Sequence, residues 1–179
     1  MVLINSNNEL KKGDIAPQFS LVDTKNVYHD FGGYDKKLTL VVFMCNHCPY
    51  VLPKIEELKR IQKDFKEVLD VVAINSNNHP DYIEDDFEHM QIFFEDKKLN
   101  FDYLFDETQE IAKSYGAVCT PDPFLFDKDK KLIWRGRINE GEMSKGNNPE
   151  LDIAIKEFLE KGKITKPENP SMGCSIKWH

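Results

Sequence analysis

The stretch from Lys37 to Pro53 reads KLTLVVFMCNHCPYVLP, an apolar run that ends on two cysteines. Residues 38–44 are apolar or β-branched and include no turn residue, which is the composition of a strand buried on both faces of a sheet. Beyond Cys48 and Pro49, apolar side chains recur at helical spacing, at Val51, Ile55, Leu58 and Phe65. Cys45 and Cys48 are therefore expected at a turn from a buried strand into a helix.

That location has a chemical meaning for the two cysteines. The first turn of a helix presents unpaired N–H groups and the positive end of its dipole, and both stabilise an anion such as a thiolate. A thiol with a lowered pKa is a nucleophile near neutral pH, and a second thiol nearby can displace whatever the first has captured. The pattern predicts a reversible dithiol and disulfide pair. A CxxC spacing is also half of many zinc sites, so metal binding stays open as an alternative.

Three motifs in this order resemble the thioredoxin-like superfamily. CNHC is followed, five residues after Cys48, by Pro53, the place of the superfamily's helix-kinking proline. Residues 13–21 carry the pattern GDxAPxFxL, typical of the redoxin branch (AhpC/TSA, TlpA-like), which holds peroxiredoxins and TlpA-like disulfide reductases. Thr120 and Pro121 resemble the superfamily's cis-proline loop. The resemblance implies an α/β fold with a central mixed sheet flanked by helices, an N-terminal hairpin and an inserted helix.

Length and composition suit a single domain. A chain of 179 residues can bury a sizeable core, and we expect one domain over residues 1–162 with a tail, 163–179, packing on it. The first 12 residues lack an apolar signal core, and no run approaches the length of a membrane span, which predicts a cytoplasmic protein. The net charge of -7 comes without a basic cluster, so neither nucleic acid nor membrane is an expected partner. A monomer or a homodimer is expected.

Apolar periodicity and turn residues predict the order of the remaining elements. An edge hairpin is expected over residues 19–31 and a second buried strand over 68–75. An inserted amphipathic helix follows over 81–99, then a strand over 101–105 and a helix that ends at Gly116. Residues 123–126 and 132–138 are expected to form a hairpin around a turn at 127–130, and the last helix is expected to start at Asn148 and Pro149 and to stop at Gly162.

The resemblance assigns roles to the paired cysteines. It implies that Cys45 is the attacking thiolate and Cys48 the resolving thiol. Pro49 favours the opposite order, because proline fits best at the first helical position and would make Cys48 the residue at the helix N-cap. Peroxiredoxins resemble that second arrangement, with a reactive cysteine directly before a proline.

His47 lies between the two cysteines, where an imidazole can share charge with a thiolate and make the disulfide more oxidising. The plain alternative is an exposed turn residue. The resemblance places Thr120 and Pro121 opposite the CxxC, with a cis peptide bond that lets the backbone pair with a substrate strand. An ordinary turn is the alternative there. Cys119 would lie close to the pair in that loop, or would serve as a small buried filler.

Several features of the family are missing. Met44 and Thr39 stand where thioredoxins carry a tryptophan and a buried acid, which leaves Asp122 and Glu56 as candidates for the group that deprotonates the resolving thiol.

The peroxiredoxin signature is also incomplete, because Val41 and Cys45 stand where its proline and threonine are expected relative to Cys48. Arg135 is a candidate to assist a peroxide, but the expectation for it is a strand residue that pairs with surface acids.

The tail, KITKPENPSMGCSIKWH, is too polar and too broken by proline to form another helix. Ile176 and Trp178 are expected to anchor it on the domain, and the extended chain is long enough for Cys174 to reach the active-site face. Cys174 is then a possible third redox thiol that resolves or protects Cys45. The alternative is an unreactive cysteine in a packed tail.

The sequence thus predicts a thiol-disulfide oxidoreductase that exchanges a disulfide with a protein or small thiol partner through Cys45 and Cys48, with no cofactor and no metal. One alternative is a peroxiredoxin-like, antioxidant thiol peroxidase. Another is a module that binds zinc or copper with Cys45, Cys48 and a third ligand, which would be Cys119, Cys174 or His79.

Overall fold

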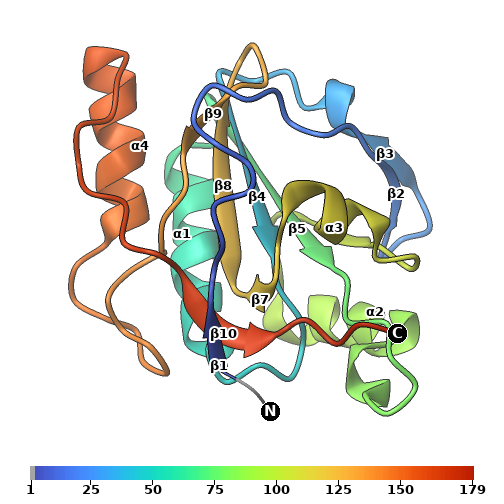
Figure 1. Cartoon of the computed structure of the whole chain (residues 1–179). Helices are drawn as coiled ribbons and strands as arrows, with labels where there is room; N and C mark the ends of the chain where they lie inside the picture. Colours follow the sequence, from blue (N-terminus) through green and yellow to red (C-terminus); the bar gives the residue numbers. More distant parts are fainter. Residues whose placement is uncertain (1–2) are drawn as a thin grey trace.

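A computed structural model of the chain describes residues 3–179 and is built on a mixed seven-stranded sheet in the order β3-β2-β6-β5-β4-β8-β9 (Figure 1). Its strands are β2 (Ser20–Asp23), β3 (Tyr28–Asp30), β4 (Leu38–Phe43), β5 (Leu69–Asn75), β6 (Asp102–Phe105), β8 (Asp122–Asp127) and β9 (Leu132–Trp134). β4 pairs parallel with β5 and antiparallel with β8. The predicted α/β fold with a mixed sheet and an N-terminal edge hairpin is confirmed.

The helices cover both faces of this sheet and bury β4 completely. They are α1 (Ile55–Asp64), α2 (Phe87–Lys97), α3 (Glu110–Tyr115) and α4 (Glu150–Lys161), with one 3-10 turn, η1 (Phe31–Gly33), after the hairpin. Leu40 and Val42 belong to the apolar cluster that includes α1, α2 and α4, whereas Val41 and Phe43 belong to the cluster that includes α3. This two-sided burial explains the unbroken apolar run that precedes Cys45.

The helix after the cysteines begins later than the sequence pattern predicts. A turn and a 3-10 segment, η2 (Leu52–Lys54), separate Cys48 from α1. Pro49 and Pro53 both lack the N–H that an α-helix needs for bonds to carbonyls four residues earlier, so the α-helix starts only after the second proline. Pro53 therefore precedes α1 and does not kink it. Because the effect of a helix dipole fades within the first turn, α1 does not account for an acidic thiol at Cys48.

The inserted helix is also shorter than expected. The predicted span 81–99 divides into a 3-10 segment, η3 (Ile83–Asp85), and α2. Asp86 separates them, because its extended backbone interrupts the helix while its side chain accepts a hydrogen bond from the His89 N–H and caps α2. The break leaves Asp85 at the end of η3, where it is fully buried.

A second, three-stranded sheet joins both ends of the chain to the middle of the sequence. Its order is β1-β10-β7, formed by β1 (Leu3–Asn5), β10 (Met172–Ser175) and β7 (Cys119–Thr120). In Figure 1 the tail crosses the molecule from α4, passes beside the N-terminal strand and ends near α2. The sequence pattern did not indicate β1 or β10. No helix within residues 3–179 combines the length and the apolar character needed to span a bilayer.

Candidate active site

The two cysteines of the CxxC lie against the Thr120–Pro121 loop. Cys45 Sγ is 3.6 Å from Thr120 Oγ1, and Cys48 Sγ is 3.3 Å from the Thr120 carbonyl oxygen. The Thr120–Pro121 peptide bond is cis. The expected cis bond and the expected contact between this loop and the CxxC are both present, so the turn after β4 and the Thr120–Pro121 loop form one compact group.

The tail adds a third sulfur to this group. Cys174 Sγ lies 3.0 Å from Cys48 Sγ, and Cys45, Cys48 and Cys174 are each fully buried. The expectation that Cys174 reaches the active-site face is met, although it contacts Cys48 and not Cys45. Ile176 is buried as an anchor, but Trp178 is 38% exposed, with the Lys113 ammonium over its ring.

The environment separates the acidities of the two CxxC thiols. Hydrogen bonding from Cys45 and from Cys174 lowers the pKa of Cys48 to about 5, although burial opposes this shift. Burial, the hydrogen bond to Cys48 and the nearby Asp85 carboxylate raise the pKa of Cys45 well above its usual range. The reduced pair therefore favours one shared proton, with the negative charge on Cys48. Pro49 suggested the same assignment, with Cys48 as the more acidic thiol. The neighbouring thiols, and not a helix dipole, lower the pKa of Cys48.

The other two cysteines remain protonated at neutral pH. Burial and the adjacent Cys48 raise the pKa of Cys174 to about 12. Burial raises the pKa of Cys119 as well; this residue is in β7, where it pairs with Ser175 of the tail. Within residues 3–179, Cys48 is thus the one cysteine whose surroundings favour a thiolate at neutral pH.

His47 is held by a buried carboxylate. Its Nδ1 lies 2.5 Å from Asp85 Oδ2, and its ring stacks on Tyr82 with 5.5 Å between ring centroids. The hydrogen bond to Asp85 raises the pKa of His47. The reading of His47 as an exposed turn residue is wrong, because its side chain is only 14% exposed.

Asp85 is the residue of the site that sequence reasoning missed. Its Oδ1 accepts from the Asn46 N–H at 2.8 Å, and its Oδ2 accepts from Asn77 Nδ2 at 3.1 Å in addition to His47. Asp85 therefore fixes the backbone between the two cysteines from a distant segment. In the sequence it belongs to the acidic run DYIEDD, which is typical of a solvated helix face, and no local signal separates it from its exposed neighbours.

The two acids considered for deprotonating the resolving thiol do not lie beside it. Glu56 is 68% exposed and pairs with Lys59. Asp122 is fully buried but pairs in register with Phe43, on the sheet face opposite the cluster that contains the CxxC. Burial raises the pKa of Asp122 to about 7, against the effect of Arg135.

The structure also differs from the expectation that Arg135 pairs with surface acids. Its Nη2 donates to Asp122 Oδ2 at 3.0 Å, and its guanidinium lies over the Phe124 ring. Both side chains of this ion pair are nearly inaccessible to solvent, so Arg135 pairs with a buried acid and not with surface acids. This fixed pair supports the core on the α3 side of the sheet.

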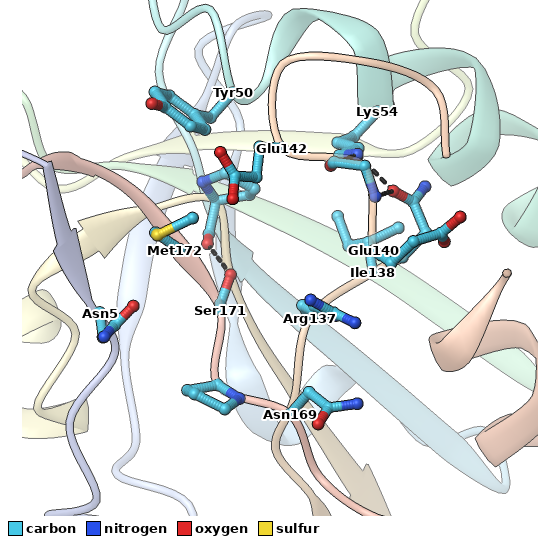
Figure 2. Close-up of a pocket in the computed structure, with 14 residues that line it drawn as sticks. Asn5, Tyr50, Lys54, Arg137, Ile138, Glu140, Glu142, Asn169, Ser171 and Met172 are labelled. Atoms are coloured by element: carbon cyan, nitrogen blue, oxygen red, sulfur yellow. Dashed lines mark hydrogen bonds between the residues drawn. The ribbon is translucent and has the colours of Figure 1, made fainter. Parts of the chain in front are cut away.

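A cavity of about 220 Å³ opens beside the cis-proline loop (Figure 2). Pro121, Tyr50, Lys54, Arg137, Glu142 and Met172 are among the residues that line it. Ser171 donates a hydrogen bond to the Pro121 carbonyl and so ties the tail to this wall. Its walls come from the cis-proline loop, the segment after Cys48 and the tail, and Pro121 follows directly on Thr120, which contacts both thiols.

The chain is similar in sequence to known proteins. The sequence model of the AhpC/TSA family matches residues 12–135, more than half of the chain. A curated relative, the thiol-disulfide oxidoreductase ResA of Bacillus cereus, is 26% identical over 160 residues, which cover 88% of this chain and 82% of that protein.

Two solved structures are similar over nearly their whole length. An uncharacterized conserved protein from Geobacillus kaustophilus is 36% identical with a TM-score of 0.93, and the match covers 100% of this chain and 97% of that one. The hypothetical protein SMc02350 from Sinorhizobium meliloti is 32% identical with a TM-score of 0.91, and covers 98% of both chains. A putative thiol:disulfide interchange protein DsbE from Chlorobium tepidum, at 20% identity, a TM-score of 0.67 and coverage of 85% and 97%, shares the fold.

Proposed function

We propose that this chain, which belongs to the AhpC/TSA family, is a thiol-disulfide oxidoreductase that exchanges a disulfide with a protein or small thiol partner through Cys45 and Cys48. The observation that carries this proposal is the unequal acidity of two thiols held together against a cis-proline loop. A thiolate attacks a disulfide, whereas a thiol does not. The neighbouring protonated thiol attacks in the second step, after it has lost its proton.

The exchange has two steps that balance. The Cys48 thiolate attacks one sulfur of the partner disulfide, so that a bond from Cys48 to the partner forms and the other partner sulfur leaves as a thiolate. That leaving thiolate takes the proton of Cys45. The Cys45 thiolate then attacks Cys48 Sγ, the Cys45–Cys48 disulfide forms, and the second partner sulfur leaves with its electron pair. The partner gains two electrons and the CxxC loses two, and the reverse sequence oxidises a partner.

Asp85 and His47 act as positioning residues in this scheme. The backbone N–H groups of Asn46 and His47 both point at Asp85 Oδ1, at 2.8 and 3.3 Å, which holds the turn that separates the cysteines. The Asp85 charge also disfavours a thiolate at Cys45 and so directs the negative charge to Cys48. The cavity beside Pro121 supplies a place for the part of the partner that flanks its disulfide.

Trapping of the mixed disulfide tests the proposal. Cys45→Ser combined with Cys174→Ser removes both thiols that contact Cys48, so this double variant should retain a covalently bound partner at Cys48. Cys48→Ser, which removes the attacking thiolate, should retain much less. A Cys48→Ser variant that traps partner at Cys45 as efficiently would reverse the assigned roles, and the absence of adducts from both variants would contradict the exchange.

The redox potential of the pair is expected to lie above that of thioredoxin. A thiolate stabilised at Cys48 favours the reduced pair, which makes the disulfide more oxidising than thioredoxin's roughly −270 mV, at about −220 to −150 mV. Equilibration with glutathione buffers measures this value directly. A potential at or below that of thioredoxin would show that neither His47 nor the neighbouring thiols tune the couple.

A thiol peroxidase is the first alternative, since AhpC/TSA is the family that the chain belongs to. Peroxidase catalysis would need a donor to peroxide beside the thiolate, and the Arg135 guanidinium is instead held by buried Asp122. Rapid consumption of hydrogen peroxide by the reduced protein, lost in Cys48→Ser, would favour this alternative. We expect slow consumption.

Metal binding is the second alternative, and one observation favours it. Ligand atoms of Cys45, His47 and Asp85 all lie within 4.8 Å of one another, and cysteine, histidine and aspartate are zinc ligands. The ligand set expected from the sequence was Cys45, Cys48 and a third residue. The set found in the structure keeps Cys45 and has His47 and Asp85 in place of the others. Metal analysis of protein purified without chelator separates the two functions, because the exchange reaction requires a nearly metal-free pair. Stoichiometric zinc that is lost in Asp85→Asn would favour the metal site.

A further inference from the structure

The tail occupies the position where a partner strand would lie in the proposed exchange. β10 pairs antiparallel with β7, with Cys174 opposite Thr120 and Ser175 opposite Cys119, directly before cis-Pro121. An extended peptide that adds a strand to such an edge is a common mode of recognition. The tail therefore occupies the β7 edge, where a substrate peptide would pair. Cys174 is the tail residue that lies opposite Thr120.

The approach of this strand is close and leaves the thiols without access to solvent. A Cβ atom added at Gly173 would lie 1.9 Å from the Thr120 carbonyl oxygen, so glycine is needed for β10 to sit at this distance. Cys45, Cys48 and Cys174 are each fully buried. Cys48 is the central sulfur, hydrogen-bonded to Cys45 and 3.0 Å from Cys174.

We propose that Cys174 is a third redox-active cysteine, which attacks the Cys45–Cys48 disulfide at Cys48 and forms a Cys48–Cys174 disulfide. The Cys174 thiol gives up its proton, and its sulfur forms a bond to Cys48 Sγ. The Cys45–Cys48 bond breaks, and Cys45 leaves with the electron pair and takes up the proton. Nothing is oxidised or reduced overall, because one disulfide replaces another within the chain.

This inference rests on the proposed function, which supplies the initial Cys45–Cys48 disulfide or a partner bound at Cys48. The two sulfurs need to approach by only about 1 Å to reach the length of a disulfide bond. Cys45 is a good acceptor of the proton, since burial raises its pKa well above the usual range. The tail then acts as an internal partner that resolves adducts at Cys48 when Cys45 cannot.

The decisive experiment uses Cys45→Ser, in which Cys174 is the remaining thiol beside Cys48. Glutathione disulfide should form an adduct at Cys48, and Cys174 should displace glutathione to leave a Cys48–Cys174 disulfide. Peptide mapping after an acid quench identifies this link. The double variant Cys45→Ser/Cys174→Ser should instead keep one glutathione at Cys48, whereas the control Cys45→Ser/Cys119→Ser should behave as Cys45→Ser.

Two results would overturn the inference, and they are distinguishable. If Cys45→Ser keeps glutathione at Cys48 while Cys174 remains alkylatable after unfolding, Cys174 is not redox-active and the proposed function still stands. If Cys48 takes no glutathione in either variant, the exchange function fails together with the inference.

Gly173→Ala gives an independent test of the tail's position. The added methyl group should displace β10 from Thr120 and increase the rate at which a thiol reagent modifies Cys48 by roughly tenfold or more, as expected for the overlap of a methyl group with a packed backbone. The same variant should form less Cys48–Cys174 disulfide. Gly32→Ala is the matched control, because an added Cβ there meets nothing within 4 Å. Equal reactivity of the two variants would contradict the assigned position of the tail.

Discussion

Cys48→Ser is expected to abolish the thiolate that the reduced protein carries at neutral pH. The wild-type protein should show a thiolate absorbance that titrates with a midpoint near pH 5, the pKa to which the neighbouring thiols lower Cys48. In Cys48→Ser that step should disappear, and alkylation of the native protein at pH 7 should fall to the few per cent expected of an ordinary thiol or lower. An ultraviolet pH titration together with alkylation rates measures both effects.

Cys45→Ala tests whether the neighbouring Cys45 thiol lowers the pKa of Cys48, and Cys119→Ser is the control. The hydrogen bond from Cys45 is the largest cause of the lowered Cys48 pKa, so Cys45→Ala should move the midpoint upward without removing the step. Cys119→Ser should leave it in place, since burial keeps Cys119 protonated. A step that survives in Cys48→Ser but is lost in Cys45→Ala would place the thiolate at Cys45.

Asp85→Ala is expected to lower the free energy of unfolding by about 3 kcal/mol, the lower end of the cost of breaking a buried ion pair. Asp85 is fully buried and accepts hydrogen bonds from Asn46, His47 and Asn77, and all of these donors would lose their acceptor. Denaturant unfolding measures the change. The control is Asp81→Ala in the same segment, which should stay within about 0.5 kcal/mol of wild type because its side chain is 84% exposed.

The stability difference between wild type and Asp85→Ala should also depend on pH. The hydrogen bond to Asp85 raises the pKa of His47 in the folded state above its value in the unfolded chain, roughly 6.5. The contribution of the pair is then fully present below that pH and is lost as the pH rises through the raised pKa of the folded state. The difference in unfolding free energy between wild type and Asp85→Ala should therefore become smaller at alkaline pH. It should not vanish, because Asn46 and Asn77 also donate hydrogen bonds to Asp85. A difference that grows with pH would contradict a charged His47 in this pair.

The parts of the fold and site that sequence predicts well are those with local signals. β4 is recognisable because burial on both faces leaves it with no polar alternation, and the chain turns immediately after it at Cys45. The Thr120–Pro121 loop is recognisable because a proline precedes an apolar strand at the place that the family resemblance assigns. Gly116 and Gly162 end their helices with left-handed backbone, as their positions predict.

The remaining features depend on contacts between distant segments. The polar tail forms β10 because β1 and β7 offer edges on both sides, and no periodicity in its own sequence reports those partners. Asp85 is buried because the CxxC turn offers N–H donors 39 residues earlier. The acidity of Cys48 arises from Cys45 and Cys174, and the second of these is 126 residues away.

Single-turnover transfer of a disulfide tests the central claim most directly. Protein carrying the Cys45–Cys48 disulfide is mixed with a reduced peptide that contains two cysteines, and both disulfides are quantified after an acid quench. The exchange function predicts one peptide disulfide formed for each protein disulfide lost, with no transfer from Cys48→Ser treated in the same way. A protein disulfide that persists while the peptide stays reduced, even when the peptide has the lower potential, would contradict it.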